Sequence, residues 1–349
     1  MTLLGPGSRA LDSRSMTASN PIRYLSAADV VAAMPPLAER LQLAERTMTA
    51  LVDAAELPPK IGVHPRPKGS FAHAMPAFLR GAEPDGGGDL LGLKWIAGFP
   101  ANRERGIPAI HGLVLLTDPA TGLPTAILDA GPITAQRTAA VSGVAIGRFR
   151  PPVADRPTRV AVLGAGVQGR SHVPVIGSVV RGADLVVFDR HGDRATALAA
   201  VASETQGIGS VGTASSALEA TESADIVVTA ASFAAPEDRQ PLTADWLTAD
   251  ALVVAVDYAT YVAASVARGA ALFLVDQREQ FLANRDAGAF DGYPDPSATI
   301  GEAIVSGTTR PPRGQVVVTH LGVGLADLVF GDAILRRATA QGLGTLLPG

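Results

Sequence analysis

Cysteine is absent from this chain of 349 residues, and other features that mark particular classes of protein are missing as well. Without cysteine there is no disulfide, no thiolate nucleophile and no cysteine-ligated metal. The six histidines do not form HExxH or a comparable ligand spacing, so the sequence predicts no metal site. The net charge is −4, which offers no basic surface to nucleic acid or anionic lipid.

A long uncharged apolar segment is also missing. The longest apolar stretch, residues 251–275, contains Asp257 and Arg268 and has the pattern of strand, helix and strand, so it is not predicted to cross a membrane. Residues 1–25 carry several charges without an apolar core and do not resemble a signal peptide, so we expect a loose leader there. These absences favour a cytoplasmic protein with no membrane or nucleic-acid partner.

What the sequence does contain is a glycine-rich turn. Gly164, Gly166 and Gly169 directly follow the apolar run 160–163. A buried strand that turns through three glycines into a helix is how a chain wraps a pyrophosphate. A second strand over 184–188 ends at Asp189, about 20 residues further on, where an acid can bond the adenosine ribose. This arrangement predicts a Rossmann-type domain; the alternative is a glycine turn in an α/β domain without a cofactor.

The acid favours NAD(H), because a carboxylate accepts ribose hydroxyls and repels a 2′-phosphate. NADP(H) stays open, since Arg190 follows and could meet that phosphate. More cofactor contacts are expected at the carboxyl ends of the strands, which face the crevice in doubly wound sheets. The predicted cofactor-binding set is Gly164, Gly166, Val167, Gln168, Gly169, Asp189, Arg190, Thr229, Ala230, Val256, His320 and Leu321, together with Arg137.

The apolar periodicity predicts two domains. A helical pattern over 30–55 is divided by Pro35-Pro36, and strands follow in a largely antiparallel sheet; Gly86–Gly88 are expected to form a flexible loop. The predicted strands of this part are 71–78, 90–96, 107–116 and 125–129. A helix over 133–149 precedes the glycine-rich domain, whose later strands are 224–229, 251–256, 272–275 and 315–319, and a final helix covers 322–338.

The predicted fold class is therefore α/β: a Rossmann-type doubly wound dinucleotide-binding domain plus an α+β substrate and dimerisation domain. We place the substrate and dimerisation domain at 1–132 and the dinucleotide-binding domain at 133–320. Residues 321–349 are expected to carry a helix back to the first domain.

Two charged residues occupy apolar patterns. Lys94 interrupts the strand 90–96 on the same face as Gly92 and Ile96, so it is either buried with a lowered pKa or placed on a solvated face. Arg137 lies on the apolar stripe of its helix, one turn after Ile133. An arginine there usually has a buried carboxylate or phosphate partner, and the alternative is a structural ion pair.

Asp257 follows the predicted strand 251–256. An acid at the carboxyl end of such a strand is a candidate proton donor or acceptor, and the alternative is an N-cap for the following helix. Lys60, after two prolines, says little by itself.

These residues stand in a sequence that resembles the ornithine cyclodeaminase/μ-crystallin family from about Pro58 to Leu347. The similarity is carried by Gly92-Leu93-Lys94-Trp95, by Ile133 to Ala140, by Met75-Pro76-Ala77, by the glycine loop and by Gly322 to Asp327.

The resemblance implies a homodimer that binds NAD(H) or NADP(H) and acts on α-amino or α-imino acids. It implies a lysine beside the substrate at Lys94 and an arginine that grips the substrate carboxylate at Arg137. Lys60 occupies the place of a further basic residue, normally an arginine. Asp257 is the nearest residue to the place of the family's acid/base. Lys94 and Asp257 are thus the candidate catalytic residues.

One position departs from the family pattern. Members that cyclise ornithine carry a glutamate two residues before the Met-Pro pair, where this chain has His73. The candidate substrate-binding residues are Lys60, His73, Met75, Lys94 and Arg137. Three functions compete: an amino-acid dehydrogenase or ketimine reductase, a cyclodeaminase that makes proline or a homologue and recycles NAD, and a non-catalytic protein that binds the cofactor and a small ligand.

Overall fold

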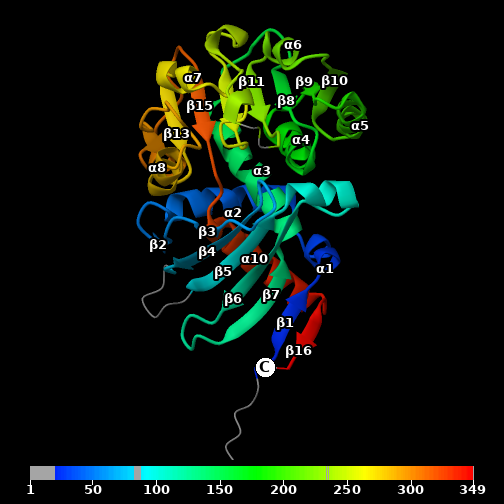
Figure 1. Cartoon of the computed structure of the whole chain (residues 1–349), viewed down its shortest axis with the longest axis vertical. Helices are drawn as coiled ribbons and strands as arrows, with labels where there is room; N and C mark the ends of the chain where they lie inside the picture. Colours follow the sequence, from blue (N-terminus) through cyan, green and yellow to red (C-terminus); the bar gives the residue numbers. More distant parts are fainter. Residues whose placement is uncertain (1–19, 82–87, 233, 235, 349) are drawn as a thin grey trace, which may run out of the picture.

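Two large β-sheets, one above the other, form the framework of the molecule (Figure 1). The computed structural model describes residues 20–348 except 82–87, 233 and 235. Within them each sheet has eight strands. The predicted loop at Gly86–Gly88 falls largely outside the described residues, as does most of the predicted leader.

The upper sheet contains the glycine-rich segment and is parallel throughout, in the order β10-β9-β8-β11-β12-β15-β13-β14. Its strands are β8 (Arg159–Leu163), β9 (Ala183–Phe188), β10 (Ile208–Thr213), β11 (Ile226–Thr229), β12 (Leu252–Ala255), β13 (Leu272–Val275), β14 (Ala298–Thr299) and β15 (Val316–Thr319). Its helices are α4 (Val167–Val179), α5 (Gly192–Ser203), α6 (Ala217–Thr221), α7 (Ala264–Gly269), α8 (Arg278–Asp286) and α9 (Ile300–Val305).

Both faces of this sheet are buried. Val160 and Val162 of β8 belong to one hydrophobic cluster, whereas Ala161 and Leu163 belong to another. Alternate side chains of a strand point to opposite faces, so a strand with apolar residues at every position needs cover on both sides. The strand order reverses direction at β8, which is the doubly wound arrangement that the glycine motif predicted.

The lower sheet is mainly antiparallel, in the order β16-β1-β7-β6-β5-β4-β2, with β3 also pairing with β4. Its strands are β1 (Ile22–Leu25), β2 (Ala55–Glu56), β3 (Ile61–Val63), β4 (Phe71–Leu79), β5 (Leu90–Gly98), β6 (Ile110–Thr117), β7 (Pro124–Asp129) and β16 (Thr345–Leu347). The helices α1 (Ala27–Ala32) and α2 (Leu37–Ala50) precede β2, and Pro35-Pro36 divides them as predicted.

Two helices connect this sheet to the rest of the chain. α3 (Ala130–Phe149) lies between the two sheets and packs on α4, α2 and β6 (Figure 1). It begins three residues before the predicted start, because the Asp129 side chain caps it by accepting from the N–H of Gly131 and because Pro132 is tolerated in a first turn. α10 (Gly324–Ala340) returns to pack on β4, β5 and β6. No helix among the described residues is long and apolar enough to span a bilayer.

The prediction of a loose leader over 1–25 is wrong for its last residues. Residues 22–25 form β1, which pairs with β7 on one side and with β16 on the other. The strand β16 lies more than 300 residues further along the chain. Pairing over such a distance leaves no local pattern in a strand of four residues. The domain boundaries at 132 and 320 stay predictions.

Candidate active site

The glycine loop has the shape of an anion cradle. Gly164 has a φ of +112°, and a Cβ atom there would lie 2.5 Å from the carbonyl oxygen of Ala230, so only glycine fits. Gly166, the N-cap of α4, offers no side-chain cap to the first N–H groups of the helix, and the space beside its Cα is open. Unpaired N–H groups at the start of a 13-residue helix, with room in front of them, suit a phosphate group.

Asp189 lies directly beside this loop. It follows β9, and its carboxylate accepts hydrogen bonds from the N–H groups of Ala165 (2.8 Å) and His191 (2.9 Å). Each oxygen keeps a lone pair for a ribose hydroxyl. Arg190 is exposed beside it. The structure thus brings the predicted acid to the predicted glycine turn.

Four further predicted cofactor residues, Thr229, Ala230, Val256 and His320, lie along the same edge of the upper sheet, whereas Arg137 lies in α3. The N–H of Ala230 bonds the carbonyl of Leu163, that of Val256 bonds Thr229, and that of His320 bonds Ala255. These backbone bonds join the carboxyl ends of neighbouring parallel strands, where doubly wound sheets bind their ligands.

The second group of predicted residues forms a buried cation cluster on the lower sheet. Lys94 is fully buried in β5, and its ammonium donates to Asp327 Oδ1 of α10 and to Thr134 Oγ1 of α3, both at 2.8 Å. The Nε of Arg137 lies 3.3 Å from the same oxygen of Asp327. One buried carboxylate therefore contacts both cations. Of the two placements that the sequence left open for Lys94, the structure shows the buried one. Asp327 is also the acidic partner of Arg137.

Lys60 adds a third cation to this cluster. Its ammonium donates to the Tyr258 hydroxyl (2.6 Å) and to the carbonyl of Leu321 (2.7 Å). Burial lowers the pKa of Lys60 to about 8, with Asp276 acting in the opposite direction. Asp276 is itself buried, and its carboxylate accepts from the N–H of Gly322 at 2.6 Å.

Burial dominates the electrostatics of Lys94. It lowers the pKa of this ammonium to about 7, although Asp327 raises it. Arg137 and Lys60, two like charges, lower it further. Lys94 can therefore hold or release a proton close to neutral pH.

His73 and Met75 share the face of β4 that carries this cluster, because Met75 pairs with Lys94 across the sheet and His73 lies two residues away. Burial, followed by Lys60 and His64, lowers the pKa of His73 to about 4. The ring is therefore neutral at neutral pH and supplies no negative charge to this face of the sheet.

Asp257 behaves differently from the three cations. It is 1% exposed at the end of β12, and burial raises its pKa to about 6, with the Thr229 hydroxyl acting in the opposite direction. The cations of the cluster are not among the main influences on this pKa. The two residues after it, Tyr258 and Ala259, have φ values of +53° and +57°, a strained conformation that is concentrated at functional sites.

Sequence reasoning missed four members of the site: Asp327, Thr134, Tyr258 and Asp276. Asp327 had a readable signal, since it is an acid within the apolar pattern of α10, as Arg137 is within that of α3. Asp276 follows the apolar strand β13 just as Asp257 follows β12. Thr134 and Tyr258 carried no signal of comparable strength.

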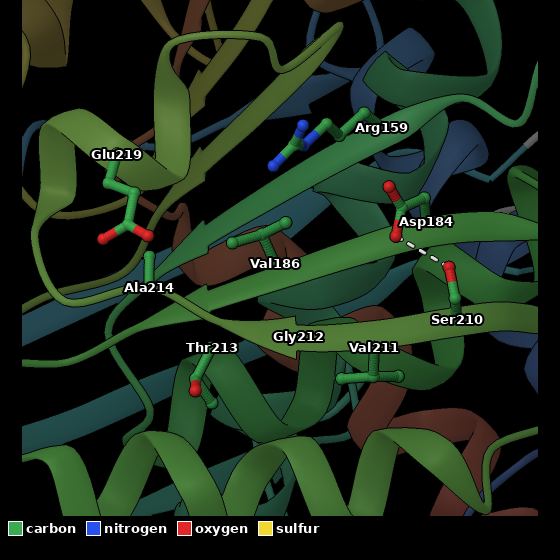
Figure 2. Close-up of a pocket in the computed structure, with 9 residues that line it drawn as sticks. All are labelled: Arg159, Asp184, Val186, Ser210, Val211, Gly212, Thr213, Ala214 and Glu219. Carbon is green, nitrogen blue, oxygen red and sulfur yellow. Dashed lines mark hydrogen bonds between the residues drawn. The ribbon is translucent and has the colours of Figure 1, made fainter.

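A hollow on the upper sheet, shown in Figure 2, is separate from this site. It lies over β8, β9 and β10, where Ser210 donates to Asp184 at 2.7 Å, and Glu219 approaches from α6. None of the predicted site residues lines it. In the described part of the chain no group of three or more histidine, aspartate or glutamate residues is arranged to hold a metal ion.

The fold and the site together define a Rossmann-type dinucleotide-binding protein with a buried, cation-rich cluster on its second sheet. The chain belongs to the ornithine cyclodeaminase/mu-crystallin family, whose family model matches residues 27–310.

Individual relatives match over most of their length. The nodulation efficiency protein NfeD of Rhizobium meliloti is 33% identical over 94% of this chain and 98% of its own. The ketimine reductase mu-crystallin of Mus musculus is 29% identical over 76% and 79%. The structure of the Thermococcus litoralis Delta(1)-pyrroline-2-carboxylate reductase, solved with NADH and L-proline, is similar with a TM-score of 0.78, 25% identity, and coverage of 93% of this chain and 99% of that one.

Proposed function

We propose that this protein is an NAD(H)-dependent oxidoreductase that acts at the α-carbon of an amino or imino acid through an imine intermediate. The observation that carries the proposal is the pairing of Lys94 and Arg137 on one buried carboxylate, on a sheet face that also presents His73 and Met75. Two of the similar proteins carry the names of such oxidoreductases: one is a ketimine reductase and the other is a Delta(1)-pyrroline-2-carboxylate reductase.

The residues fit the cofactor. The open N-terminus of α4 suits the pyrophosphate, and Asp189 is placed for the adenosine ribose. The strand ends at Thr229, Val256 and His320 would line the rest of the crevice. When bound, NAD(H) takes a hydride from the substrate α-carbon or delivers one to it.

The cation cluster fits a substrate with one carboxylate. Lys60, Lys94 and Arg137 influence one another electrostatically, and the acids that act on them are Asp276 and Asp327. With both lysines protonated and both acids ionised, the cluster has one net positive charge. A monoanionic substrate would neutralise it, and a buried charge is stable only when it is paired.

Lys94 is the group that would move a proton. A protonated Lys94 can polarise and protonate an imine during reduction, and a neutral Lys94 can accept a proton from the amine during oxidation. Its pKa near 7 allows both. Asp257, whose pKa is about 6, stays the second candidate for this role.

A substrate panel tests the proposal. Amino acids, and 2-oxo acids with amines, are offered with NAD+ or NADH, while absorbance and ammonia are followed together. The proposal expects a net change in NADH absorbance. Ammonia release without that change would select a cyclodeaminase, and the absence of both over the whole panel would select a binding protein without catalysis.

Ornithine is expected to be a poor substrate. Its side-chain ammonium would enter a site that already holds Lys60, Lys94 and Arg137, and His73 is neutral there. Desolvating an unpaired ammonium costs several kcal/mol, enough to weaken binding by about a thousandfold. The measurement compares kcat/KM for ornithine and for norvaline, which has the same length without the amine. Efficient conversion of ornithine to proline and ammonia, with catalytic amounts of NAD, would contradict this expectation.

Asp189→Ala is expected to weaken NADH binding by about tenfold, because a charge-assisted hydrogen bond to the ribose is lost. The preference for NADH over NADPH should become smaller as well, because the carboxylate no longer repels a 2′-phosphate. Dissociation constants of both cofactors are measured by fluorescence titration. Asp193→Ala, which removes an exposed acid four residues further on, is the matched control and should leave both constants unchanged. A wild-type protein that binds NADPH more tightly than NADH would overturn the assignment.

The proposal includes a homodimer formed through the outer face of the lower sheet. α10 packs on its inner face, whereas Trp95 and Leu113, paired across β5 and β6, are 44% and 43% exposed on the other. Exposed apolar neighbours of this kind mark interaction sites. The predicted cytoplasmic location stays a prediction.

Trp95→Glu is expected to convert the dimer into a monomer, because it places a charge in an apolar interface. Sedimentation velocity of both proteins measures the change. Val201→Glu, at a residue on α5 that is 46% exposed, gives the same chemical change away from this face and should leave the dimer intact. A dimeric Trp95→Glu protein would place the interface elsewhere.

A further inference from the structure

A chain of buried hydrogen bonds links the glycine loop to the end of β15. The ring of His172, in α4, contacts the backbone carbonyl of Gln168 through Nδ1 at 2.6 Å and the hydroxyl of Ser142, in α3, through Nε2 at 2.8 Å. The same hydroxyl contacts Nε2 of His320 at 2.8 Å. All three side chains are fully buried or nearly so.

The protons along this chain can have only one arrangement. A carbonyl only accepts, so Nδ1 of His172 must donate to Gln168. Burial lowers the pKa of His172 to about 4, so the ring is neutral and its Nε2 accepts the single hydroxyl proton of Ser142. The Ser142 oxygen then has only lone pairs left for His320, whose Nε2 must donate.

This arrangement fixes the tautomer of His320. Burial also lowers its pKa well below the ordinary value, so its ring is neutral and carries one proton, on Nε2. Nδ1 is therefore a bare acceptor. It is buried, and among the described residues it has no hydrogen-bond partner. An acceptor kept in one state and left unpaired is costly unless a ligand donates to it.

The position of His320 shows which region this acceptor serves. It follows β15, and its N–H bonds the carbonyl of Ala255 at the end of β12. The next residue, Leu321, gives its carbonyl to Lys60. Lys60 and Arg137 both lower the pKa of His320, so the ring lies within electrostatic range of the cation cluster. His320 thus stands between the glycine loop and the substrate face.

We propose that Nδ1 of His320 accepts a hydrogen bond from the carboxamide NH2 of the nicotinamide ring and so fixes the orientation of that ring. The proposal rests on the proposed function, since it requires NAD(H) in the crevice. A neutral donor fits better than the ammonium of a substrate, because the region already contains Lys60 and Arg137. His320 is thereby a specificity residue for the carboxamide.

The test uses the reduced form of 3-acetylpyridine adenine dinucleotide, in which a methyl group replaces the carboxamide NH2. Dissociation constants of this analogue and of NADH are measured by fluorescence titration. Wild type is expected to prefer NADH by on the order of tenfold, because the analogue leaves the buried acceptor unpaired.

Two variants separate the two ring nitrogens. A glutamine amide reaches about as far as Nε2, so His320→Gln keeps the bond to Ser142 and loses the acceptor at Nδ1; its preference for NADH should fall close to one. An asparagine amide reaches about as far as Nδ1, so His320→Asn keeps an acceptor there and loses the bond to Ser142; its preference should stay within about threefold of wild type. Thermal unfolding without cofactor checks that both variants are folded.

The outcomes are distinct. A wild-type preference close to one, or a His320→Gln protein that keeps the full preference, overturns the assignment of the carboxamide to His320. The wild-type ratio decides by itself if a variant fails to fold. A wild-type protein that binds neither dinucleotide contradicts the proposed function instead, and this result cannot be confused with equal binding of the two.

Discussion

Arg137→Ala is expected to reduce kcat/KM by about a thousandfold or more while the dissociation constant of NADH changes little. Arg137 bonds Asp327 through Nε, and its two Nη groups have no hydrogen-bond partner in the part of the chain that the structure describes. A guanidinium presents these groups as a fork that matches a carboxylate. Two charge-assisted hydrogen bonds at about 1.5–3 kcal/mol each account for this loss.

The measurement combines steady-state kinetics on the best substrate of the panel with NADH titration and thermal unfolding. Arg137→Lys keeps the charge without the fork, so it should recover only part of the activity. Arg148→Ala is the matched control: Arg148 lies on the same helix and donates to the carbonyls of Ala303 and Thr308, so its loss should lower stability and leave kcat/KM unchanged. A folded Arg137→Ala protein with near-normal kcat/KM would leave Arg137 as a structural ion-pair partner only.

The residues that the sequence predicted well are those whose signal is local. The period of two places Lys94 with Gly92 and Ile96, and all three are buried. The period of 3.6 places Arg137 on the buried stripe of α3. The strand, the glycines and the following acid are close enough in the chain to predict the loop and Asp189 together.

What the sequence could not provide is the partner of each buried charge. Asp327 is 233 residues from Lys94 and 190 from Arg137, and nothing within α10 says which charges it meets. The same limit explains β1, whose four residues gain their structure from β7 and β16. The proton order through Ser142, His172 and His320 is also invisible in the sequence, because it depends on which lone pairs meet in space.

Asp327 shows what such a distant partner contributes to stability. Its side chain is fully buried and is the carboxylate that both Lys94 and Arg137 contact. Asp327→Asn keeps the size and an oxygen acceptor but removes the charge. Arg137 then stays buried without its counter-ion and Lys94 must release its proton on folding, which together are expected to lower the free energy of unfolding by about 3–5 kcal/mol at neutral pH. Asp332→Asn is the control on the same helix, since it breaks an ion pair with the exposed Arg336 and should cost less than about 1 kcal/mol.

The loss is also expected to depend on pH, with a sign that follows from Lys94. In the folded wild type its pKa is about 7, below the ordinary value of 10.5, so between these values the unfolded chain binds more protons and stability rises with pH. Removing Asp327 takes away the influence that raises this pKa, which therefore falls below 7. Above pH 7 Lys94 is then neutral in both folded proteins, whereas below pH 7 only the variant must fold with Lys94 deprotonated. The stability deficit of Asp327→Asn, measured by urea unfolding from pH 6 to 9, should thus be largest near pH 6 and shrink as the pH passes 7.

The midpoint of the pH profile of imine reduction should move downward in parallel, because protonated Lys94 supplies the proton. A deficit that is constant across this range, with an unchanged profile, would separate Asp327 from the protonation of Lys94.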